Sequence, residues 1–163
     1  MTENEKETLV EEEDTQKGKF LTFRLEKETY GIEIKYVIEI IGIQEITEVP
    51  QLPEFIKGII NLRGRIIPVM DVRLRFKKNF VEYNDRTCVI VVDINDLSLG
   101  LIVDGVSEVV SIKEEDIVPP PDIRNNNESR YICGIGKVED DVKLLLDIEK
   151  LLNVDELNEL TNV

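Results

Sequence analysis

Apolar and polar residues alternate in short stretches along most of the chain. Leu21, Phe23 and Leu25 alternate with Thr22 and Arg24, and the alternation resumes over residues 30–34 after a polar turn at residues 26–29. A period of two residues places successive side chains on opposite faces of a strand. We therefore predict a hairpin of two half-buried strands near the start of the chain.

The segment after this hairpin carries a mixed signal. Its apolar residues between 34 and 41 recur at the spacing of one helical face, but the segment is short, rich in β-branched side chains and followed by Gly42. We predict a brief helical turn that leads into a strand. Pro50 and Pro53 favour an extended segment over residues 46–53, placed at the edge of a sheet.

Residues 58–72 have the pattern of a more deeply buried hairpin. Its apolar segments, 58–62 and 66–72, flank the turn Asn61-Leu-Arg-Gly64. Asn and Gly adopt the backbone conformations of a tight reversal, so Arg63 is predicted at the hairpin tip, where side chains are presented rather than packed. A solvated turn residue and a contact residue for a partner are both open interpretations of Arg63.

The second half of the chain repeats the pattern of the first. An offset of 69 residues sets Gly31 on Gly100 and Glu39 on Glu108, and an offset of 76 residues then sets residues 69–72 on residues 145–148. Glycine, proline and acidic positions match as well as apolar ones. We interpret this match as an internal duplication of a unit of about 60 to 70 residues.

A unit of this size with many short strands is typical of a five-stranded barrel, which removes exposed sheet edges. We therefore predict an all-β fold of two five-stranded barrels packed side by side, at approximately residues 18–77 and 84–152, within one domain over residues 18–152. Short helical connections and a short C-terminal helix over residues 147–152 complete it. Residues 1–17 are predicted to be a disordered acidic tail, and residues 153–163 a C-terminal tail.

The charge of the chain disfavours several classes of partner. Its 163 residues carry a net charge of −14, with 34 acidic and 20 basic residues, whereas DNA, RNA and anionic bilayers require clustered Lys and Arg. No apolar run reaches the roughly 18 residues of a membrane span, and the N-terminus lacks the apolar core of a signal peptide. We expect a cytoplasmic protein with no direct membrane insertion.

The residues that most enzymes need are missing or isolated. The chain has no histidine, which removes histidine from acid–base, nucleophilic and metal chemistry. Cys88 and Cys133 lack metal-ligand spacing and are expected to be small buried side chains. Acidic clusters at residues 93–96 and 139–141 fit hairpin turns better than calcium sites. We expect no catalytic residue, no metal and no cofactor, and favour a binding module.

Two carboxylates interrupt apolar strips. Glu39 and its repeat mate Glu108 each stand among Val and Ile residues, where a carboxylate either lies at a rim or is paired. A structural ion pair and a binding role are both open. The apolar neighbours fit one wall of a groove for a partner helix.

Five stretches of the chain resemble a known family. The stretches 20–25, 30–34, 55–76, 100–110 and 145–152, with the core Lys57-Gly-Ile-Ile-Asn-Leu-Arg-Gly-Arg-Ile-Ile-Pro-Val69, are similar to the CheW-like family of bacterial chemotaxis coupling proteins. The resemblance covers roughly residues 18–152 and implies two SH3-like five-stranded barrels. It also implies a non-enzymatic adaptor that links methyl-accepting chemotaxis receptors to the regulatory domain of the histidine kinase CheA in arrays at the inner face of the membrane.

The resemblance also implies site residues. Receptor binding is expected to involve Val37, Glu39, Gly58, Arg63 and Gly64, in a groove between the barrels. For the kinase, the resemblance implies docking of barrel to barrel, with Val118 and Ile123 near the proline run as candidate contacts.

Other assignments remain possible from the sequence. CheW-like barrels also occur in CheA and CheV proteins, although the length of this chain suggests one double barrel with no catalytic or receiver segment. From a different class, small barrels bind nucleic acid, which the net charge of −14 disfavours and a filter-binding assay would test.

Overall fold

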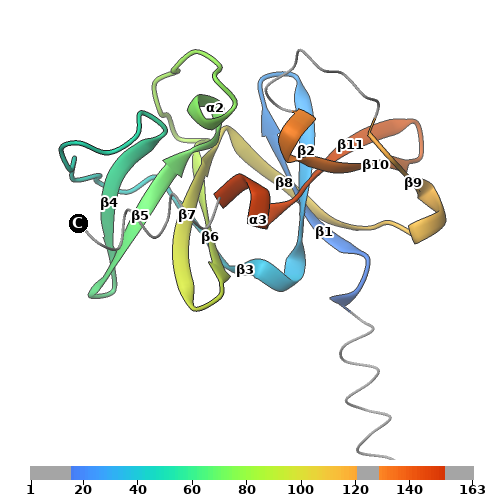
Figure 1. Ribbon diagram of the computed structural model, residues 1–163, viewed down its shortest axis with the longest axis horizontal. Coiled ribbons are helices and arrows are strands. Elements are labelled where there is room, and N and C mark those ends of the chain that lie inside the picture. The colour runs from blue at the N-terminus through green and yellow to red at the C-terminus, as the bar shows by residue number, and fades with distance from the viewer. Residues whose placement is uncertain (1–15, 121–128, 153–163) are drawn as a thin grey trace, which may run out of the picture.

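The computed structural model describes residues 16–120 and 129–152, so nearly all of the two predicted tails, and Ile123, lie outside the described residues. The described chain forms two curled sheets, here called barrel A and barrel B, which lie side by side (Figure 1). No helix in these ranges is long and apolar enough to cross a membrane.

Barrel A, on the right of Figure 1, has the strand order β8-β1-β2-β11-β10-β9. Its strands are β1 (Lys19–Leu25), β2 (Glu28–Glu33), β8 (Gly105–Ser111), β9 (Ile117–Val118), β10 (Ile132–Val138) and β11 (Asp141–Leu146). Barrel B, on the left, has the order β3-β6-β7-β5-β4. Its strands are β3 (Val37–Gly42), β4 (Ile56–Leu62), β5 (Arg65–Asp71), β6 (Cys88–Ile94) and β7 (Leu97–Val103).

Short helices connect the strands. They are η1 (Ile34–Tyr36), α2 (Val72–Arg75), η2 (Glu114–Asp116), η3 (Ser129–Tyr131) and α3 (Ile148–Leu152). Asp71 caps α2, since its side chain accepts a hydrogen bond from the Leu74 backbone N–H. The predicted all-β architecture is therefore confirmed, with one difference: the two-residue strand β9 gives barrel A a sixth strand.

Most local predictions are confirmed. The first predicted hairpin is β1 and β2, the brief helical turn is η1 followed by β3, and the buried hairpin is β4 and β5. The expected edge segment 46–53 contributes one bridge, from Thr47 to Ile59. The prediction that both cysteines are buried is wrong, because Cys133 is exposed and Cys88 is half-buried. Cys133 lies where the β10–β11 ladder shifts register, which interrupts the alternation of its strand.

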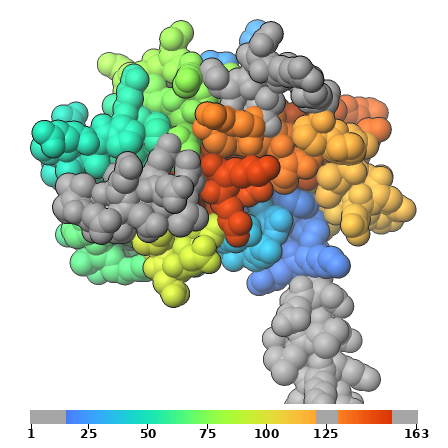
Figure 2. Space-filling view, in the orientation of Figure 1, coloured from blue at the N-terminus to red at the C-terminus, as the bar shows by residue number. Residues whose placement is uncertain are grey.

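The prediction that each barrel is one contiguous part of the chain, 18–77 or 84–152, is wrong. Strands β1 and β2 pair with β8 and β11, so they join the barrel built mainly from the C-terminal part of the chain. Likewise β6 and β7 pair with β3 and β5. Figure 2 shows the result at the surface, where blue and orange-to-red atoms share one half of the molecule.

The exchange of strands is the same in both barrels. Replacing each strand by its repeat mate converts the order β8-β1-β2-β11-β10 into β3-β6-β7-β5-β4, including the parallel pairs β2 with β11 and β7 with β5. The repeat-mate glycines Gly31 and Gly100 stand in these parallel pairs. A Cβ on Gly31 would lie 3.0 Å from Leu145 Cδ2, and one on Gly100 would lie 2.9 Å from Val69 Cγ1. The glycines leave room for the partner strand's side chains.

The largest core cluster crosses from one barrel to the other. Phe23 and Tyr30 of barrel A and Met70 of barrel B are each no more than 1% exposed. Phe23, Tyr30, Phe76 and Tyr131 form a row of rings whose centroids are 5.8, 5.5 and 5.5 Å apart. Aromatic side chains bury the largest areas, so this row makes a large contribution to holding the barrels together.

Charged side chains form hydrogen bonds and ion pairs at the junction between the barrels. Asp104 connects β7 of barrel B to β8 of barrel A, and Arg73 of α2 donates from Nε to Asp104 Oδ1 at 2.7 Å and from Nη1 to Glu26 Oε1 at 3.2 Å. Burial acts to raise the pKa of Asp104, but hydrogen bonds from Arg73 and from the Glu26 backbone N–H lower it, and the net shift is downward. Arg75, nearly buried, donates from Nε to the Leu151 carbonyl at 2.9 Å.

A charge placed in the core of barrel B should unfold it. Val69 is fully buried in β5, and Val69→Asp would bury a carboxylate without a partner, at a cost of at least about 3 kcal/mol in unfolding free energy. Ile66→Asp is the matched control, because Ile66 lies on the same strand with 61% of its surface exposed, and it should cost less than about 1 kcal/mol. Urea denaturation followed by circular dichroism measures both; equal costs would contradict the core assignment.

Candidate functional site

The candidate site is built on the tip of the β4–β5 hairpin. Arg63 and Gly64 are its two loop residues, with φ of 53° and 87°. Positive φ at both positions is typical of a type I′ turn, whose twist matches that of the flanking strands. The Gly64 backbone N–H donates to Asn61 Oδ1 at 2.8 Å, which fixes the turn from within. The Arg63 side chain is consequently presented outward, with 73% of it exposed.

Arg63 forms a two-pronged ion pair with Glu39. Its Nη1 donates to Glu39 Oε1 at 2.8 Å and its Nη2 to Glu39 Oε2 at 2.9 Å. Glu39 lies on β3 and Arg63 follows β4, and these two strands are the opposite edges of the sheet in barrel B. The pair therefore bridges the two edges where the sheet curls round. Glu39 is therefore a paired carboxylate at the edge of the sheet.

The ion pair shifts the titration of both groups. The hydrogen bond from Arg63 is the main cause that holds the pKa of the Glu39 carboxyl below its usual range, and the same bond raises the pKa of Arg63. A fork of two parallel N–H···O bonds has one favoured geometry, so it orients the guanidinium group as well as attracting it. Arg63 keeps three N–H donors that Glu39 does not use.

A second arginine ties the other side of the hairpin tip. Arg65 donates from Nη2 to Ser98 Oγ at 2.7 Å, and the Ser98 hydroxyl donates to Asp93 Oδ1. Because Asp93 and Ser98 belong to β6 and β7, the tip is anchored to the sheet on this side and to β3 through Arg63 on the other. Sequence reasoning missed Arg65, whose polar partners are distant in the chain.

The repeated barrel lacks this ion pair. The 76-residue offset places Glu139 at the position of Arg63, with a similar φ of 56°, and the 69-residue offset places Glu108 at the position of Glu39. Two carboxylates cannot replace an arginine–carboxylate pair. The site is therefore specific to barrel B, and the charge difference between repeat mates is the sequence signal that marks it.

The structure brings together some of the predicted site residues and separates others. Val37 is half-buried at the start of β3 and packs against the core cluster, two residues from Glu39. Gly58 lies near the opposite end of β4 from Arg63, with a φ of 148°. A Cβ on Gly58 would stand 2.1 Å from the Thr47 carbonyl oxygen, so Gly58 admits the 46–47 segment rather than facing the ion pair.

The predicted kinase-contact residues are placed only in part. Val118 lies half-buried on β9, which pairs with β10 at the edge of barrel A. Ile123 lies outside the described residues.

Exposed isoleucines lie next to Glu39 and next to Arg65 in the sequence, on strands β3 and β5. Ile38 and Ile40, on either side of Glu39, are 51% and 43% exposed, and Ile66, one residue beyond Arg65, is 61% exposed. An oriented guanidinium group with apolar neighbours is suited to bind a protein surface, because arginine and aliphatic groups together bind carboxylates and apolar faces. No cluster of three or more metal-ligating side chains occurs in residues 16–120 and 129–152.

Comparison with known proteins gives a consistent result. The family model described as the CheW-like domain matches residues 19–156. The chain is 41% identical over 144 residues to the chemotaxis protein CheW of Klebsiella aerogenes, covering 88% of this chain and 87% of that protein. It is 34% identical over 146 residues to CheW of Helicobacter pylori, covering 89% and 87% respectively.

A solved structure agrees with the fold. The scaffolding protein TtCheW of Thermoanaerobacter tengcongensis superposes with a TM-score of 0.77 at 38% sequence identity, covering 85% of this chain and 94% of that chain. This similarity identifies the two curled sheets as the paired SH3-like barrels that the sequence predicted.

Removing Arg63 should raise the pKa of Glu39 from its lowered value. A carboxyl pKa that is lowered on folding adds stability above its unfolded value, and that stability is lost as pH falls through the lowered pKa. Arg63→Ala should return the Glu39 pKa toward its usual range, measured by carbon-detected NMR titration. Arg65→Ala is the control and should move it less, since Arg65 acts only through a weaker charge effect. Equal shifts would contradict the pairing.

The two glycines of the hairpin should differ in their tolerance of alanine. Gly58→Ala would push a Cβ into the Thr47 backbone and should cost roughly 2–4 kcal/mol in unfolding free energy. At Gly64 no atom lies within 4 Å of the new Cβ, so Gly64→Ala should cost only the strain of its positive φ, about 1 kcal/mol. Thermal and urea unfolding measure the difference, and a larger cost at Gly64 would show that the packing role of Gly58 is wrong.

Proposed function

Because this chain belongs to the CheW-like domain family, we propose that it links chemoreceptors to the regulatory domain of the histidine kinase CheA, without catalysing a reaction itself. The chain is a chemotaxis scaffold protein of the CheW type, as the resemblance in its sequence indicated. The relatives support this assignment over the CheA and CheV alternatives, because they carry the CheW name and match over most of their own length.

The observation that carries the receptor assignment is the exposed but oriented guanidinium group of Arg63. Receptor cytoplasmic tips are helical, and a helix presents carboxylates beside apolar residues on neighbouring turns. Arg63 supplies free N–H donors for a carboxylate, and Ile38 and Ile40 of β3 and Ile66 of β5 supply exposed apolar surface on the strands that carry Glu39 and follow the hairpin tip. We place the receptor contact on this surface.

The other predicted receptor residues support this contact in different ways. Glu39 holds the Arg63 guanidinium group, and Val37 anchors the start of the strand that carries Glu39. Gly64 permits the turn, whereas Gly58 permits the backbone approach at the far end of β4. In this proposal Gly58 affects receptor binding through the shape of the hairpin and not by contact.

The kinase contact is proposed on a separate surface. Val118 on β9 lies at the edge of barrel A, whereas Arg63 belongs to barrel B. Ile123 is retained as a candidate from the sequence. Contacts on different barrels would allow one chain to hold a receptor and a kinase together, in arrays at the inner face of the membrane.

Loss of Arg63 should separate the two binding activities. Arg63→Ala is expected to weaken binding to a receptor cytoplasmic fragment by roughly tenfold or more, because a charge-assisted pair with the receptor is lost. Binding to the CheA regulatory domain should stay within about twofold, since a turn-tip side chain contributes little to the core. Isothermal titration calorimetry with each partner measures both.

Matched variants sharpen this test. Glu39→Gln keeps Arg63 but loosens its orientation, so its receptor affinity should fall between those of the wild type and Arg63→Ala. Lys27→Gln, at an exposed residue of the turn between β1 and β2, removes one positive charge elsewhere and should bind both partners normally. Failure of the wild type to bind either partner would refute the adaptor function, and loss of both activities in Arg63→Ala would refute the separate surfaces.

A further inference from the structure

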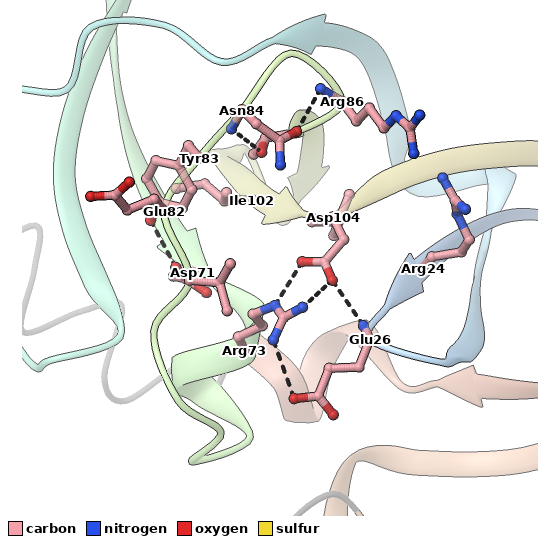
Figure 3. Close-up of a pocket in the computed structure, with 13 residues that line it drawn as sticks. Arg24, Glu26, Asp71, Arg73, Glu82, Tyr83, Asn84, Arg86, Ile102 and Asp104 are labelled. Atoms are coloured by element: carbon pink, nitrogen blue, oxygen red, sulfur yellow. Dashed lines mark hydrogen bonds and ion pairs between the residues drawn. The ribbon is translucent and has the colours of Figure 1, made fainter.

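A cavity of about 210 Å³ opens at the junction between the two barrels (Figure 3). It is lined by Arg24 of β1, by residues of the segment 81–87 and of the end of β7, and by Glu26, Asp71, Arg73 and Asp104. None of the residues placed at the Arg63 site lines this cavity. Its chemistry is therefore independent of the receptor contact.

The carboxylates on one side of the cavity already have donors. Asp104 accepts from Arg73 and from the Glu26 backbone N–H, and Glu26 in turn accepts from Arg73. Asp71 accepts from the Tyr83 hydroxyl at 2.7 Å. The remaining acidic residue, Glu82, is exposed and points away from the arginines on the other side of the cavity (Figure 3).

Two guanidinium groups occupy the other side. Arg24 and Arg86 point toward one another in Figure 3, and neither side chain donates a hydrogen bond to a residue within the described ranges. Both residues border Gly105: a Cβ there would lie 3.0 Å from Arg24 Nη2 and 3.7 Å from the Arg86 carbonyl oxygen. The absent side chain of Gly105 leaves room for Arg24. Arg24 also attracts the Asp104 carboxylate, which Arg73 already holds.

Neutral donors lie beside these arginines. Thr87 is 6% exposed, and its Oγ1 accepts from the Asn84 backbone N–H at 2.9 Å, which leaves the hydroxyl proton without an acceptor among the described residues. Asn84 Oδ1 accepts from the Arg86 backbone N–H at 2.8 Å, so the side-chain NH₂ of Asn84 is also available. Together with the two arginines, these side chains offer hydrogen-bond donors on this side of the cavity, which suit a ligand that accepts hydrogen bonds.

We propose that this cavity binds a phosphate group between the guanidinium groups of Arg24 and Arg86, with Thr87 and Asn84 as additional donors. Two positive charges that line one side of a cavity favour a dianion over the single charge of a carboxylate, and a phosphate group carries about −1.5 to −2 at neutral pH. Arginine matches the geometry of phosphate with paired N–H donors. The volume is below the roughly 300 Å³ of the smallest organic ligand sites, so the cavity accepts inorganic phosphate or the phosphoryl end of a monoester.

Inorganic phosphate is the first probe. The melting temperature of the full chain should rise with phosphate concentration and should not rise with chloride at matched ionic strength, because a ligand that binds only the folded state stabilises it. Arg24→Gln and Arg86→Gln should each weaken phosphate binding, measured by calorimetry, by about tenfold or more. Lys137→Gln is the control that removes a positive charge outside the cavity, and it should bind phosphate as the wild type does.

Two further measurements distinguish a phosphate ester from the free ion and test the site on the wild-type chain, where misfolding of a variant has no effect. Glycerol phosphate binding more tightly than inorganic phosphate would support an ester as the ligand, and the reverse order would support the free ion. ³¹P NMR line broadening by the wild-type chain, reversed by excess sulfate, tests the site without any variant. Acetate binding as tightly as phosphate, absence of any response to phosphate, or unchanged affinity in both well-folded arginine variants would overturn the proposal.

Discussion

The hydrophobic core that the two barrels share is the constraint on which the rest of the structure depends. Phe23 and Tyr30 of barrel A pack in the same cluster as Met70 of barrel B. Because each barrel also takes two strands from the other part of the duplication, cutting the chain between the repeats would leave both sheets incomplete. The double barrel is therefore one cooperative unit, and the relative position of the two barrels is set by packing rather than by a linker.

On this rigid framework, the main effect of the Arg63–Glu39 ion pair is to orient a side chain and not to add stability. An exposed ion pair contributes little to stability, since water screens it and both side chains lose freedom on pairing. Its effect is to hold one guanidinium orientation at the tip of a hairpin that Asn61 fixes from within and Arg65 anchors to the sheet. In the proposed receptor contact, the receptor meets a group that is already ordered, so less conformational entropy is lost on binding.

The sequence predicted the local elements, the duplication and the family, because alternation, turn residues and spacing are recorded in neighbouring positions. It did not predict the strand exchange. Alternation in β1 shows that Phe23 is buried, but the repeat-mate strands offer equivalent edges, and both pairings satisfy the same pattern. Gly31 and Gly100 were a local clue, since each lies on an exchanged strand and makes room for a side chain of the strand that it joins. The candidate site was found in part: Arg63 and Glu39 stood out separately, while their pairing depends on how the sheet curls.

Duplication explains how one small chain acquires distinct surfaces. The two barrels share a strand order, so the framework around each hairpin tip is alike, yet one tip carries Arg63 and the other Glu139. A similar contrast separates Glu39, which is paired, from Glu108, whose backbone carbonyl accepts a hydrogen bond from Thr22. Changes at a turn tip or on an open strand face cost little stability, because no core contact depends on them. The buried positions thus keep the barrels alike, while the exposed positions are free to differ, as the proposed receptor and kinase contacts on different barrels require.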